Sequence, residues 1–540
     1  MGMHGGHFTI FTLEDCPHCR RAKAALKAKD LTYSEISLTT HPQRRKDMLS
    51  VSNRLTVPQV FLADRYIGGA DETLEFLKDY NAGEKDDKED ATEATQPPTD
   101  PRLQPSTDPP VEPPKPPPPR PESDLIPLPN NNGGTASVLE TMEQLKQVMP
   151  TRDLPYRLTY YRNCCTGADL VQALKKAYPH DEDETTTAEL NDEQALKFGI
   201  LLQQRQILHH VVGDHDLEDS NKYYFRLQCY QTPHILNSYR IWTIPPPPND
   251  QRDDVALVIL LKKMLAKIES LASSNSEDGL VDYVALQQHE LFPPFEEAAC
   301  ELQTVDLGTM DRNTLLAFGI NAYNLFVKYA FIKVGIPNSS TSRSAFFTQV
   351  KFNIGGHLYS FNDFEHGILR GNRRPPYTLS KPIGSSGDPR LAFVLESEQV
   401  DCRIHFALNC GAKSCPPVKT FTALDIEEEL RIVAQAFCED DNNVLVDQES
   451  QTLYLSKILS WYMVDFCAAE SELPLKVMDF LHDDKKARLQ IMLDQQQANP
   501  SSKSISIKYM SYDWGTDASN SLTFDAGNLK ASYYSVTALF

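Results

Sequence analysis

Hydrophobic and polar positions near the N-terminus alternate between strand and helix patterns. A short β-rich run covers His7 to Leu13, and a helical stretch rich in Ala, Leu, Lys and Arg follows over Arg20 to Lys29. Further β-rich runs lie at 33–36 and 56–61. Short runs of β-branched and aromatic residues are typical of strands, whereas longer amphipathic stretches are typical of helices. The pattern predicts a small α/β domain.

A second block of hydrophobic positions predicts helices followed by strands. Leu170 and Leu174 share one face of a predicted helix. Another helix is predicted over 192–206, with Asn191 as its N-cap. The block closes with β-rich runs at 207–211 and 221–227. This succession predicts a second, α+β domain.

The third block contains a helix pattern, Asn313 to Val334, that is apolar on nearly all sides and is therefore predicted to be buried. Asn321 and Asn324 lie three residues apart on it, and buried amides need hydrogen-bond partners. They form either a structural clamp or part of a site. The longest wholly apolar run, Val255 to Leu261, is followed by two lysines, so no segment is predicted to span a bilayer.

Proline-rich segments separate these blocks. Residues 97–129 contain 15 prolines, which cannot supply the backbone donors that helices and sheets require. We predict a semi-rigid extended linker, with docking of an SH3-like partner as the alternative. A shorter break lies at Pro245 to Pro248. The predicted organisation is an N-terminal domain (1–82), an acidic and proline-rich disordered linker (83–136), a middle domain (137–244), a linker and helix (245–284) and a C-terminal domain (285–540).

Composition supports several domains and a reducing environment. The 540 residues exceed what one hydrophobic core accommodates. There are 53 basic and 74 acidic side chains, and the resulting net charge of −21 argues against general nucleic-acid binding. The eleven cysteines are odd in number and thinly scattered, so they do not suggest a disulfide framework. We expect a cytoplasmic protein that uses some of its thiols for chemistry.

One cysteine pair has the spacing of a redox site. Cys16 and Cys19 form a CxxC motif between the first predicted strand and helix. The positive end of a helix stabilises thiolate over thiol, so Cys16 is predicted to be the nucleophile. Cys19, one turn later, is placed to attack a mixed disulfide on Cys16. Structural zinc would require a second ligand pair, and no further CxxC or HxxxH follows in this domain, so no metal is expected.

These motifs, together with Thr56-Val57-Pro58 and Gly68-Gly69-Ala70-Asp71, resemble glutaredoxin over residues 7–80. The resemblance implies a thioredoxin-like fold with glutathione as co-substrate. By that resemblance Pro58 is a cis-proline beside the cysteines, Val57 offers its backbone to glutathione, and Asp71 receives the glutathione amino group. Arg54 is a candidate partner for a glutathione carboxylate. Leu13 stands where the family usually carries a lysine, which predicts weaker glutathione binding.

The middle domain looks like a DEP domain, on the succession of helices and closing strands described above. The resemblance implies a winged-helix-like α+β module that binds a signalling protein or anionic membrane lipid. The cations placed to meet lipid phosphates are Lys175, Lys176 and Arg205. We expect a cytoplasmic protein that either diffuses freely or associates peripherally with a membrane.

The C-terminal domain resembles the family called domain of unknown function 547, over roughly residues 285–520. The motifs that carry the resemblance are Asn321-Ala322-Tyr323-Asn324, 361–370, 401–417 and 508–514. The resemblance implies an α+β domain that has been likened to papain-like and transglutaminase-like thiol enzymes. It supplies no reaction.

A thiol enzyme requires a cysteine, an imidazole and a group that orients the ring. Cys410 is the candidate nucleophile, because it follows a predicted strand, Ile404 to Leu408, and enters a turn. His366 and His405 are the candidate bases, with Glu365 or Asn321 as the orienting group. Strand periodicity places His405 and Cys410 on opposite faces, which favours His366.

Three alternatives remain for these C-terminal residues. Cys410 and Cys415 form a disulfide that the tethered glutaredoxin reduces, or they bind a metal together with Cys402 and His405, or all of these residues are the packed core of a pseudoenzyme. For the whole chain we predict a glutathione-linked thiol–disulfide oxidoreductase tethered to a DEP targeting module. The alternative is a redox-sensing signalling scaffold.

Overall fold

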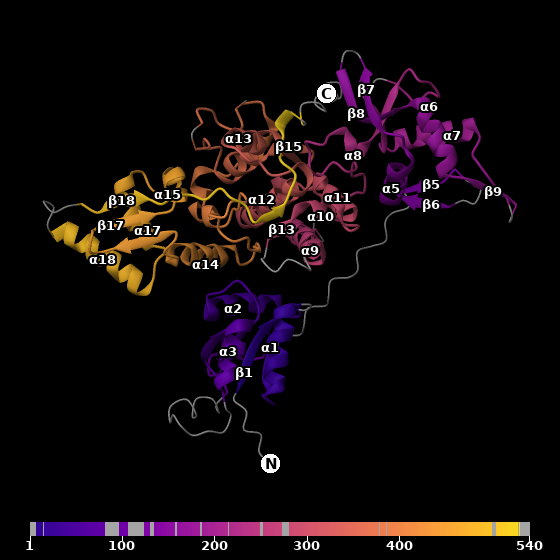
Figure 1. Cartoon of the computed structure of the whole chain (residues 1–540). Coiled ribbons are helices and arrows are strands. Elements are labelled where there is room, and N and C mark those ends of the chain that lie inside the picture. Colours follow the sequence, from indigo (N-terminus) through magenta and orange to yellow (C-terminus); the bar gives the residue numbers. More distant parts are fainter. Residues whose placement is uncertain are drawn as a thin grey trace. The chain divides into compact units, whose positions relative to one another are not determined.

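The structure is a computed structural model that describes residues 7–13, 16–80, 97–105, 124–129, 134–156, 159–183, 186–213, 215–248, 252–272, 280–376, 378–384, 386–498, 504–527 and 529. Figure 1 shows the helices and strands coloured along the sequence. The chain divides into two compact units. The first unit comprises Met1–Pro118, Leu424–Tyr454 and Pro474–Lys508. The second comprises Pro119–Ala423, Leu455–Leu473 and Tyr509–Phe540.

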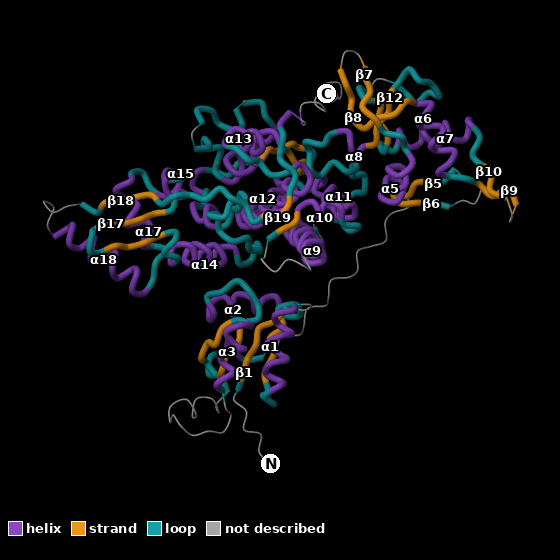
Figure 2. Tube along the Cα trace, viewed as in Figure 1, coloured by secondary structure: helices purple, strands orange, loops and turns teal. Residues whose placement is uncertain are grey.

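The N-terminal part of the first unit is the predicted α/β domain, a four-stranded sheet with the order β2-β1-β3-β4 (Figure 2). β1 is parallel to β2 and antiparallel to β3, and β3 is antiparallel to β4. The strands are β1 (Phe8–Thr12), β2 (Tyr33–Ser37), β3 (Gln59–Leu62) and β4 (Arg65–Gly68). The helices are α1 (Pro17–Ala28), α2 (Arg45–Ser52) and α3 (Ala70–Asp79).

Both faces of this sheet are buried, and β1 contributes side chains to each of them. Phe8 and Ile10 pack with α1 and α3 side chains such as Leu26 and Leu77. Phe11, on the opposite face, packs with α2 side chains in a second cluster. The alternation along β1 follows from the two-residue period of a strand. It holds the end of β1, and therefore the thiol motif that follows it, in a rigid frame.

Part of the predicted linker is folded onto this domain. Leu103, in the 3-10 helix Pro101–Leu103, is 1% exposed and joins the second cluster. Arg44 donates hydrogen bonds to the carbonyls of Arg102 (2.7 Å) and Gln104 (3.0 Å). Within the predicted linker, residues 124–129 also contain regular structure, namely the strand β5 (Leu125–Pro127). Residues 83–96, 106–123 and 130–133 of that prediction lie outside the described residues.

The rest of the first unit includes a three-stranded sheet with the order β16-β17-β18. Its strands β16 (Val444–Asp447), β17 (Thr452–Leu455) and β18 (Ser506–Tyr509) accompany the helices α14 (Ile426–Glu439), α17 (Leu473–Met478) and α18 (Asp483–Ala498). α14 and α18 both contact β16. Their apolar side chains Leu430, Leu489 and Met492 are fully buried.

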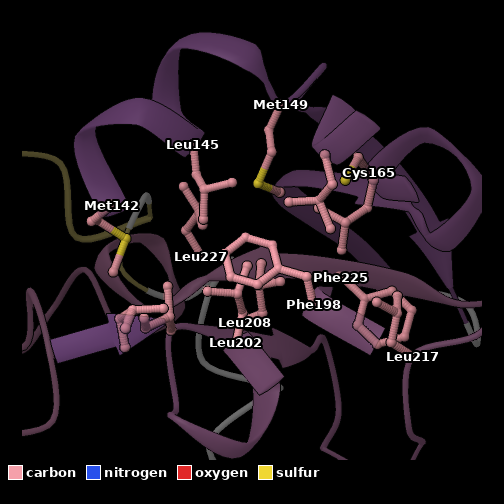
Figure 3. Close-up of a cluster of buried hydrophobic side chains, with 14 of the residues drawn as sticks. Met142, Leu145, Met149, Cys165, Phe198, Leu202, Leu208, Leu217, Phe225 and Leu227 are labelled. Atoms are coloured by element: carbon pink, nitrogen blue, oxygen red, sulfur yellow. The ribbon is translucent and has the colours of Figure 1, made fainter. Parts of the chain in front are cut away.

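The middle domain in the second unit has a sheet of order β11-β12-β8-β7 and two smaller hairpins. Its strands are β5, β6 (Thr135–Ser137), β7 (Arg152–Tyr156), β8 (Thr159–Thr166), β9 (His180–Asp183), β10 (Thr186–Ala188), β11 (Leu208–His210) and β12 (Tyr224–Leu227). Its helices are α5 (Val138–Val148), α6 (Gly167–Ala177), α7 (Asp192–Gln204) and α8 (Gln228–Gln231). Side chains of α5 meet those of α7 and β12 in the core, as Figure 3 shows. Asn191 caps α7 as predicted, since its side chain accepts the Gln194 N–H at 2.9 Å.

The remainder of the second unit is built around α12 (Arg312–Val334), the predicted all-round apolar helix. By length and composition α12 could cross a membrane. However, 94% of its apolar 18-residue stretch is buried inside the protein. The other helices are α9 (Asp254–Ala272), α10 (Tyr283–Gln288), α11 (Phe292–Ala299), α13 (Ser340–Gln349), α15 (Lys457–Trp461) and α16 (Met463–Phe466). The strands are β13 (Val281–Asp282), β14 (Lys351–Ile354), β15 (His357–Ser360) and β19 (Ala518–Asn520).

The predicted strand over Ile404 to Leu408 is wrong, because the chain forms a 3-10 helix at Cys402–Phe406. Asp401 begins this helix by accepting the Arg403 N–H at 3.0 Å. A short apolar run does not distinguish a strand from one helical turn, and the capping aspartate decides the outcome. The argument that His405 and Cys410 lie on opposite faces of a strand therefore no longer applies.

Candidate functional site

The N-terminal cysteine pair sits at the start of α1. Cys16 is the N-cap residue, and its Sγ accepts the backbone N–H of Cys19 at 3.1 Å. Cys16 is half-buried, whereas Cys19 is 1% exposed. Burial, and secondly the hydrogen bond with Cys16, raise the pKa of the Cys19 thiol. The Cys16 sulfur is thus open to an incoming disulfide, while Cys19 is held behind it as a protonated thiol.

The predicted cis-proline lies directly beside this pair. The Val57–Pro58 peptide bond is cis, as expected. Cys16 Sγ lies 3.9 Å from the Val57 carbonyl oxygen, to which the thiol donates a weak hydrogen bond. The structure therefore brings the Val57–Pro58 segment to the Cys16 sulfur.

The charged residues predicted to hold glutathione lie on the surface of the same domain. Asp71, in the first turn of α3, forms an ion pair with Arg21 at 2.6 Å, with side chains 80% and 49% exposed. Arg54 is exposed. Leu13 is exposed at the end of β1. Asp71 is therefore already neutralised by an arginine of α1, and an incoming ammonium group would have to compete with that arginine.

A second thiol pair lies in the C-terminal domain. Cys410 Sγ and Cys415 Sγ are 3.1 Å apart, and both residues are half-buried. The Cys410 N–H donates to Cys415 Sγ at 3.2 Å, and the Tyr512 hydroxyl lies 3.2 Å from the same sulfur. The hydroxyl is farther, 3.8 Å, from Cys410 Sγ. Cys415 Sγ therefore has the closer hydrogen-bond contacts of the two sulfurs.

The electrostatics of the pair follow this asymmetry. The hydrogen bond from Cys410 is the largest of the contacts that lower the pKa of Cys415, to about 7, and the Tyr512 hydroxyl and backbone N–H groups act in the same direction. The same thiol contact, followed by burial, raises the pKa of Cys410 well above its usual range. The shifts have opposite directions, so within the pair the thiolate is favoured at Cys415 over Cys410.

The histidines predicted to act as bases are engaged elsewhere. Arg370 Nη1 donates to His366 Nδ1 at 2.8 Å, and His405 Nε2 donates to Asp465 Oδ2 at 2.8 Å. Burial lowers the pKa of His366 to about 4. Among the hydrogen bonds of the described residues, those of the Cys410 thiol go to Cys415 and Tyr512 rather than to an imidazole. The structure thus does not assemble the expected cysteine–histidine pair.

The candidate orienting groups also have other partners. Glu365 accepts a hydrogen bond from the Tyr462 hydroxyl at 2.8 Å, and its carboxylate lies 3.6 Å from His366 Nδ1. Asn321 donates to the Phe421 carbonyl (2.7 Å) and accepts the Phe421 N–H (3.2 Å). Asn321 is therefore a backbone clamp rather than a partner of a histidine.

Asn324 is a second clamp, and it bears directly on the thiol loop. Its amide donates to the Ala407 carbonyl at 2.9 Å, and its oxygen accepts the Asn409 N–H at 2.8 Å. Asn409 in turn bonds the Gly411 N–H (2.7 Å) and the Pro416 carbonyl (2.7 Å). A buried helix thereby fixes the turn that carries both cysteines.

Comparison with known proteins assigns the N-terminal domain. The glutaredoxin family model matches residues 8–67. Glutaredoxin 3 of Escherichia coli is 41% identical over 63 residues, which are 12% of this chain and 76% of that protein. The chain belongs to the glutaredoxin family. Glutaredoxin 1 of Rickettsia prowazekii is 35% identical over 72 residues, 13% of this chain and 76% of that protein. A solved glutaredoxin from Brucella melitensis is 35% identical and covers 15% of this chain and 85% of its own, with a TM-score of 0.13.

Two further family models match in the predicted order. The model described as the domain found in Dishevelled, Egl-10 and Pleckstrin (DEP) matches residues 148–227. The model of the protein of unknown function DUF547 matches residues 307–438. The predicted combination of a glutaredoxin domain, a DEP domain and a DUF547 domain is confirmed, and glutaredoxin homology supports a thiol–disulfide oxidoreductase in the first of them.

Sequence reasoning placed the glutaredoxin cysteines correctly but missed partners in the DUF547 domain. Tyr512 lies in a motif noted at 508–514, yet nothing in its local pattern points to a cysteine about one hundred positions earlier. Asp465, which binds His405 and two arginines, gave no signal at all. Among the residues that the structure describes, no group of three or more His, Cys, Asp and Glu side chains is arranged to hold a metal ion.

Proposed function

We propose that the glutaredoxin domain catalyses glutathione-dependent thiol–disulfide exchange, with Cys16 as the attacking thiolate. The observation that carries the proposal is the contrast between the two sulfurs. Cys16 is half-buried and accepts a backbone N–H at the start of α1, whereas Cys19 is buried and protonated. A helix N-terminus favours a thiolate, and only an accessible thiolate attacks a disulfide.

The exchange proceeds in two balanced steps. The Cys16 thiolate attacks the glutathione sulfur of a protein–glutathione mixed disulfide, forms a Cys16–glutathione disulfide, and releases the protein thiolate, which takes a proton. A second glutathione thiolate then attacks that disulfide, yields oxidised glutathione and restores Cys16. With a protein disulfide as substrate, the Cys16 thiolate first forms a mixed disulfide with one substrate sulfur and releases the other as a thiolate that takes a proton. Cys19 then loses its proton and attacks Cys16 Sγ, which forms the Cys16–Cys19 disulfide and releases the second substrate thiol. Two glutathione molecules reduce that disulfide and become oxidised glutathione.

Glutathione would lie against the Val57–Pro58 segment, whose backbone is close to Cys16. Its amino group would meet Asp71, after displacing Arg21, and Arg54 is the candidate for a carboxylate. Leu13 contributes no charge to this surface. The proposed site therefore binds glutathione mainly through backbone contacts, with fewer cations than the family usually offers.

The test compares single variants of the full chain in a glutathione-coupled assay with a glutathionylated peptide. In a background that also carries Cys410→Ser and Cys415→Ser, Cys16→Ser is expected to abolish activity, whereas Cys19→Ser retains deglutathionylation, because the second step needs only glutathione. Cys467→Ser, which removes a half-buried thiol outside the glutaredoxin domain, is the matched control and should keep full activity. Equal loss in the Cys16 and Cys19 variants would overturn the assignment of the nucleophile.

We further propose that the DEP domain targets this activity in the cytoplasm to a protein partner. Lys175, one of the cations suggested for lipid phosphates, forms an ion pair with Asp192 at 2.8 Å, so its charge is already compensated. This favours a protein partner over an anionic membrane. We expect the full chain to sediment no more with phosphatidylserine vesicles than with neutral vesicles. Salt-sensitive sedimentation with the anionic vesicles alone would favour the membrane instead.

A further inference from the structure

Cys410 and Cys415 are positioned to exchange a pair of thiols for a disulfide. Their sulfur atoms are 3.1 Å apart, and a disulfide bond is about 2.05 Å long, so a closure of about 1 Å joins them. Both residues are half-buried free thiols. The four intervening residues form a turn, so the bond needs no contribution from a distant segment.

The two sulfurs have different chemical surroundings. The Cys410 N–H donates to Cys415 Sγ at 3.2 Å, and the Cys410 thiol (3.1 Å) and the Tyr512 hydroxyl (3.2 Å) lie within hydrogen-bond distance of the same sulfur. Donors that converge on one sulfur stabilise its anion more than its thiol. The Cys410 N–H and the closer approach of the Tyr512 hydroxyl therefore favour an anion at Cys415 over one at Cys410.

A second segment fixes the turn in this arrangement. The Lys413 N–H donates to the Gly515 carbonyl at 2.7 Å, and the Asp513 N–H donates to Ser414 Oγ at 2.8 Å. These bonds attach the turn to the segment that carries Tyr512. Because the backbone is already ordered, the two sulfurs need little rearrangement to react.

An aromatic surface lies beside the pair. The Tyr512 ring is 4.8 Å from that of Trp461 and 4.6 Å from that of Trp514, measured between ring centroids. Trp514 is 38% exposed, and the Arg343 guanidinium lies 4.2 Å from its ring centroid. Exposed aromatic rings beside a reactive sulfur offer an apolar contact surface for a peptide.

We propose that Cys410 and Cys415 form a second thiol–disulfide exchange centre, which takes a peptide disulfide as substrate and uses Cys415 as the attacking thiolate. The Cys415 thiolate attacks one sulfur of the substrate, forms a mixed disulfide and releases the other sulfur as a thiolate that takes a proton. Cys410 then loses its proton and attacks Cys415 Sγ, which forms the Cys410–Cys415 disulfide and releases the second substrate thiol. The domain loses two electrons and two protons, and the substrate gains them.

This assignment moves the nucleophile from Cys410, the candidate suggested by the sequence, to Cys415. The lowered pKa of Cys415 and the raised pKa of Cys410 agree with the geometry. No histidine is needed, because the anion is stabilised by thiol, hydroxyl and backbone donors. The proposal does not rest on the activity proposed for the glutaredoxin domain.

The test uses the full chain with Cys16→Ser and Cys19→Ser, so that the glutaredoxin thiols cannot contribute. Oxidised glutathione, a peptide disulfide, is added at neutral pH, and reaction is stopped with a thiol-blocking reagent before peptide mapping by mass spectrometry. With both C-terminal cysteines present, we expect a linked Cys410–Cys415 peptide that is lighter by two hydrogen atoms. Adding Cys410→Ser should instead trap one glutathione on Cys415.

The reciprocal variant decides which sulfur attacks. Adding Cys415→Ser should leave Cys410 at least about threefold slower to form a mixed disulfide, because a thiol with a pKa of about 8.5 or above is mostly protonated at neutral pH even without the Cys415 contact. Equal rates in the two variants, or absence of the linked peptide in the parent, would overturn the proposal. Tyr512→Phe guards against variants that fail to fold: it keeps both sulfurs and should still form the linked peptide, but the midpoint of the pH dependence of this reaction should rise, and an unchanged midpoint would also count against the proposal.

Discussion

Replacing Tyr512 with Phe removes one hydroxyl from the C-terminal thiol pair and leaves the aromatic ring in place. The hydroxyl lies 3.2 Å from Cys415 Sγ and is one of the contacts that lower its pKa. Hydrogen bonds to charged groups contribute about 1.5–3 kcal/mol, and sulfur is a weak acceptor, so about 1.5 kcal/mol is appropriate here. Since one pKa unit corresponds to about 1.4 kcal/mol, the pKa of Cys415 should rise by about one unit.

The assay is the pH dependence of iodoacetamide alkylation at Cys415, followed by peptide mapping in the chain with Cys16→Ser and Cys19→Ser. The midpoint of the profile should move up by about one pH unit, and the plateau at high pH should rise about threefold, because a more basic thiolate is more nucleophilic. At pH 7 these effects partly cancel, so the rate at one pH is not diagnostic. Tyr509→Phe is the matched control, because its hydroxyl bonds Glu470 at 2.7 Å instead. An unchanged midpoint in Tyr512→Phe would refute the reasoning.

Three further predictions concern other parts of the chain. Leu13→Lys should lower the Michaelis constant for glutathione by up to about tenfold, the effect of a partly exposed charge-assisted contact, and an unchanged constant would mean that another cation already serves. Gly411→Ala should lower the free energy of unfolding by about 2–4 kcal/mol in urea titrations, because Gly411 has φ +87° and a Cβ would lie 2.3 Å from the Phe331 ring, whereas Gly384→Ala, with open space around it, should not. Asp465→Asn should destabilise by about 3–5 kcal/mol at neutral pH. Burial alone would raise the pKa of Asp465, but hydrogen bonds from its histidine and arginine neighbours lower it overall. The stabilisation by this carboxylate is therefore present above its unfolded-state pKa and is lost as the pH falls below that value. Thermal unfolding from pH 7 to pH 3 should show a smaller loss of stability in the variant.

The glutaredoxin domain could be predicted from its sequence because its signals are local. The strand before Cys16, the helix after it and the cis-proline segment are each specified within a few residues. The helix at 312–334 was equally clear, since an all-round apolar pattern of this length has to be buried. The fold of these parts follows from patterns that span one element each.

The C-terminal site could not be predicted in the same way, because its contacts join residues far apart in the chain. Tyr512 reaches Cys415 across 97 positions, and Asp465 reaches His405 across 60. Hydrophobic periodicity carries no information about such pairs. The pattern also failed at Cys402–Phe406, where a capping aspartate produces a helical turn from a run that reads as a strand.

The two thiol pairs share one structural device in opposite chain order. In the glutaredoxin domain the backbone N–H of the second cysteine donates to the sulfur of the first, at 3.1 Å. In the DUF547 domain the backbone N–H of the first cysteine, Cys410, donates to the sulfur of the second, at 3.2 Å. A backbone N–H is set by the conformation of the chain rather than by the identity of a side chain, so each turn directs this donor at one particular sulfur. Spacing and order along the sequence therefore do not specify which cysteine of a pair accepts that hydrogen bond. The direction of the bond agrees with the attack that we propose for Cys16 in one domain and for Cys415 in the other.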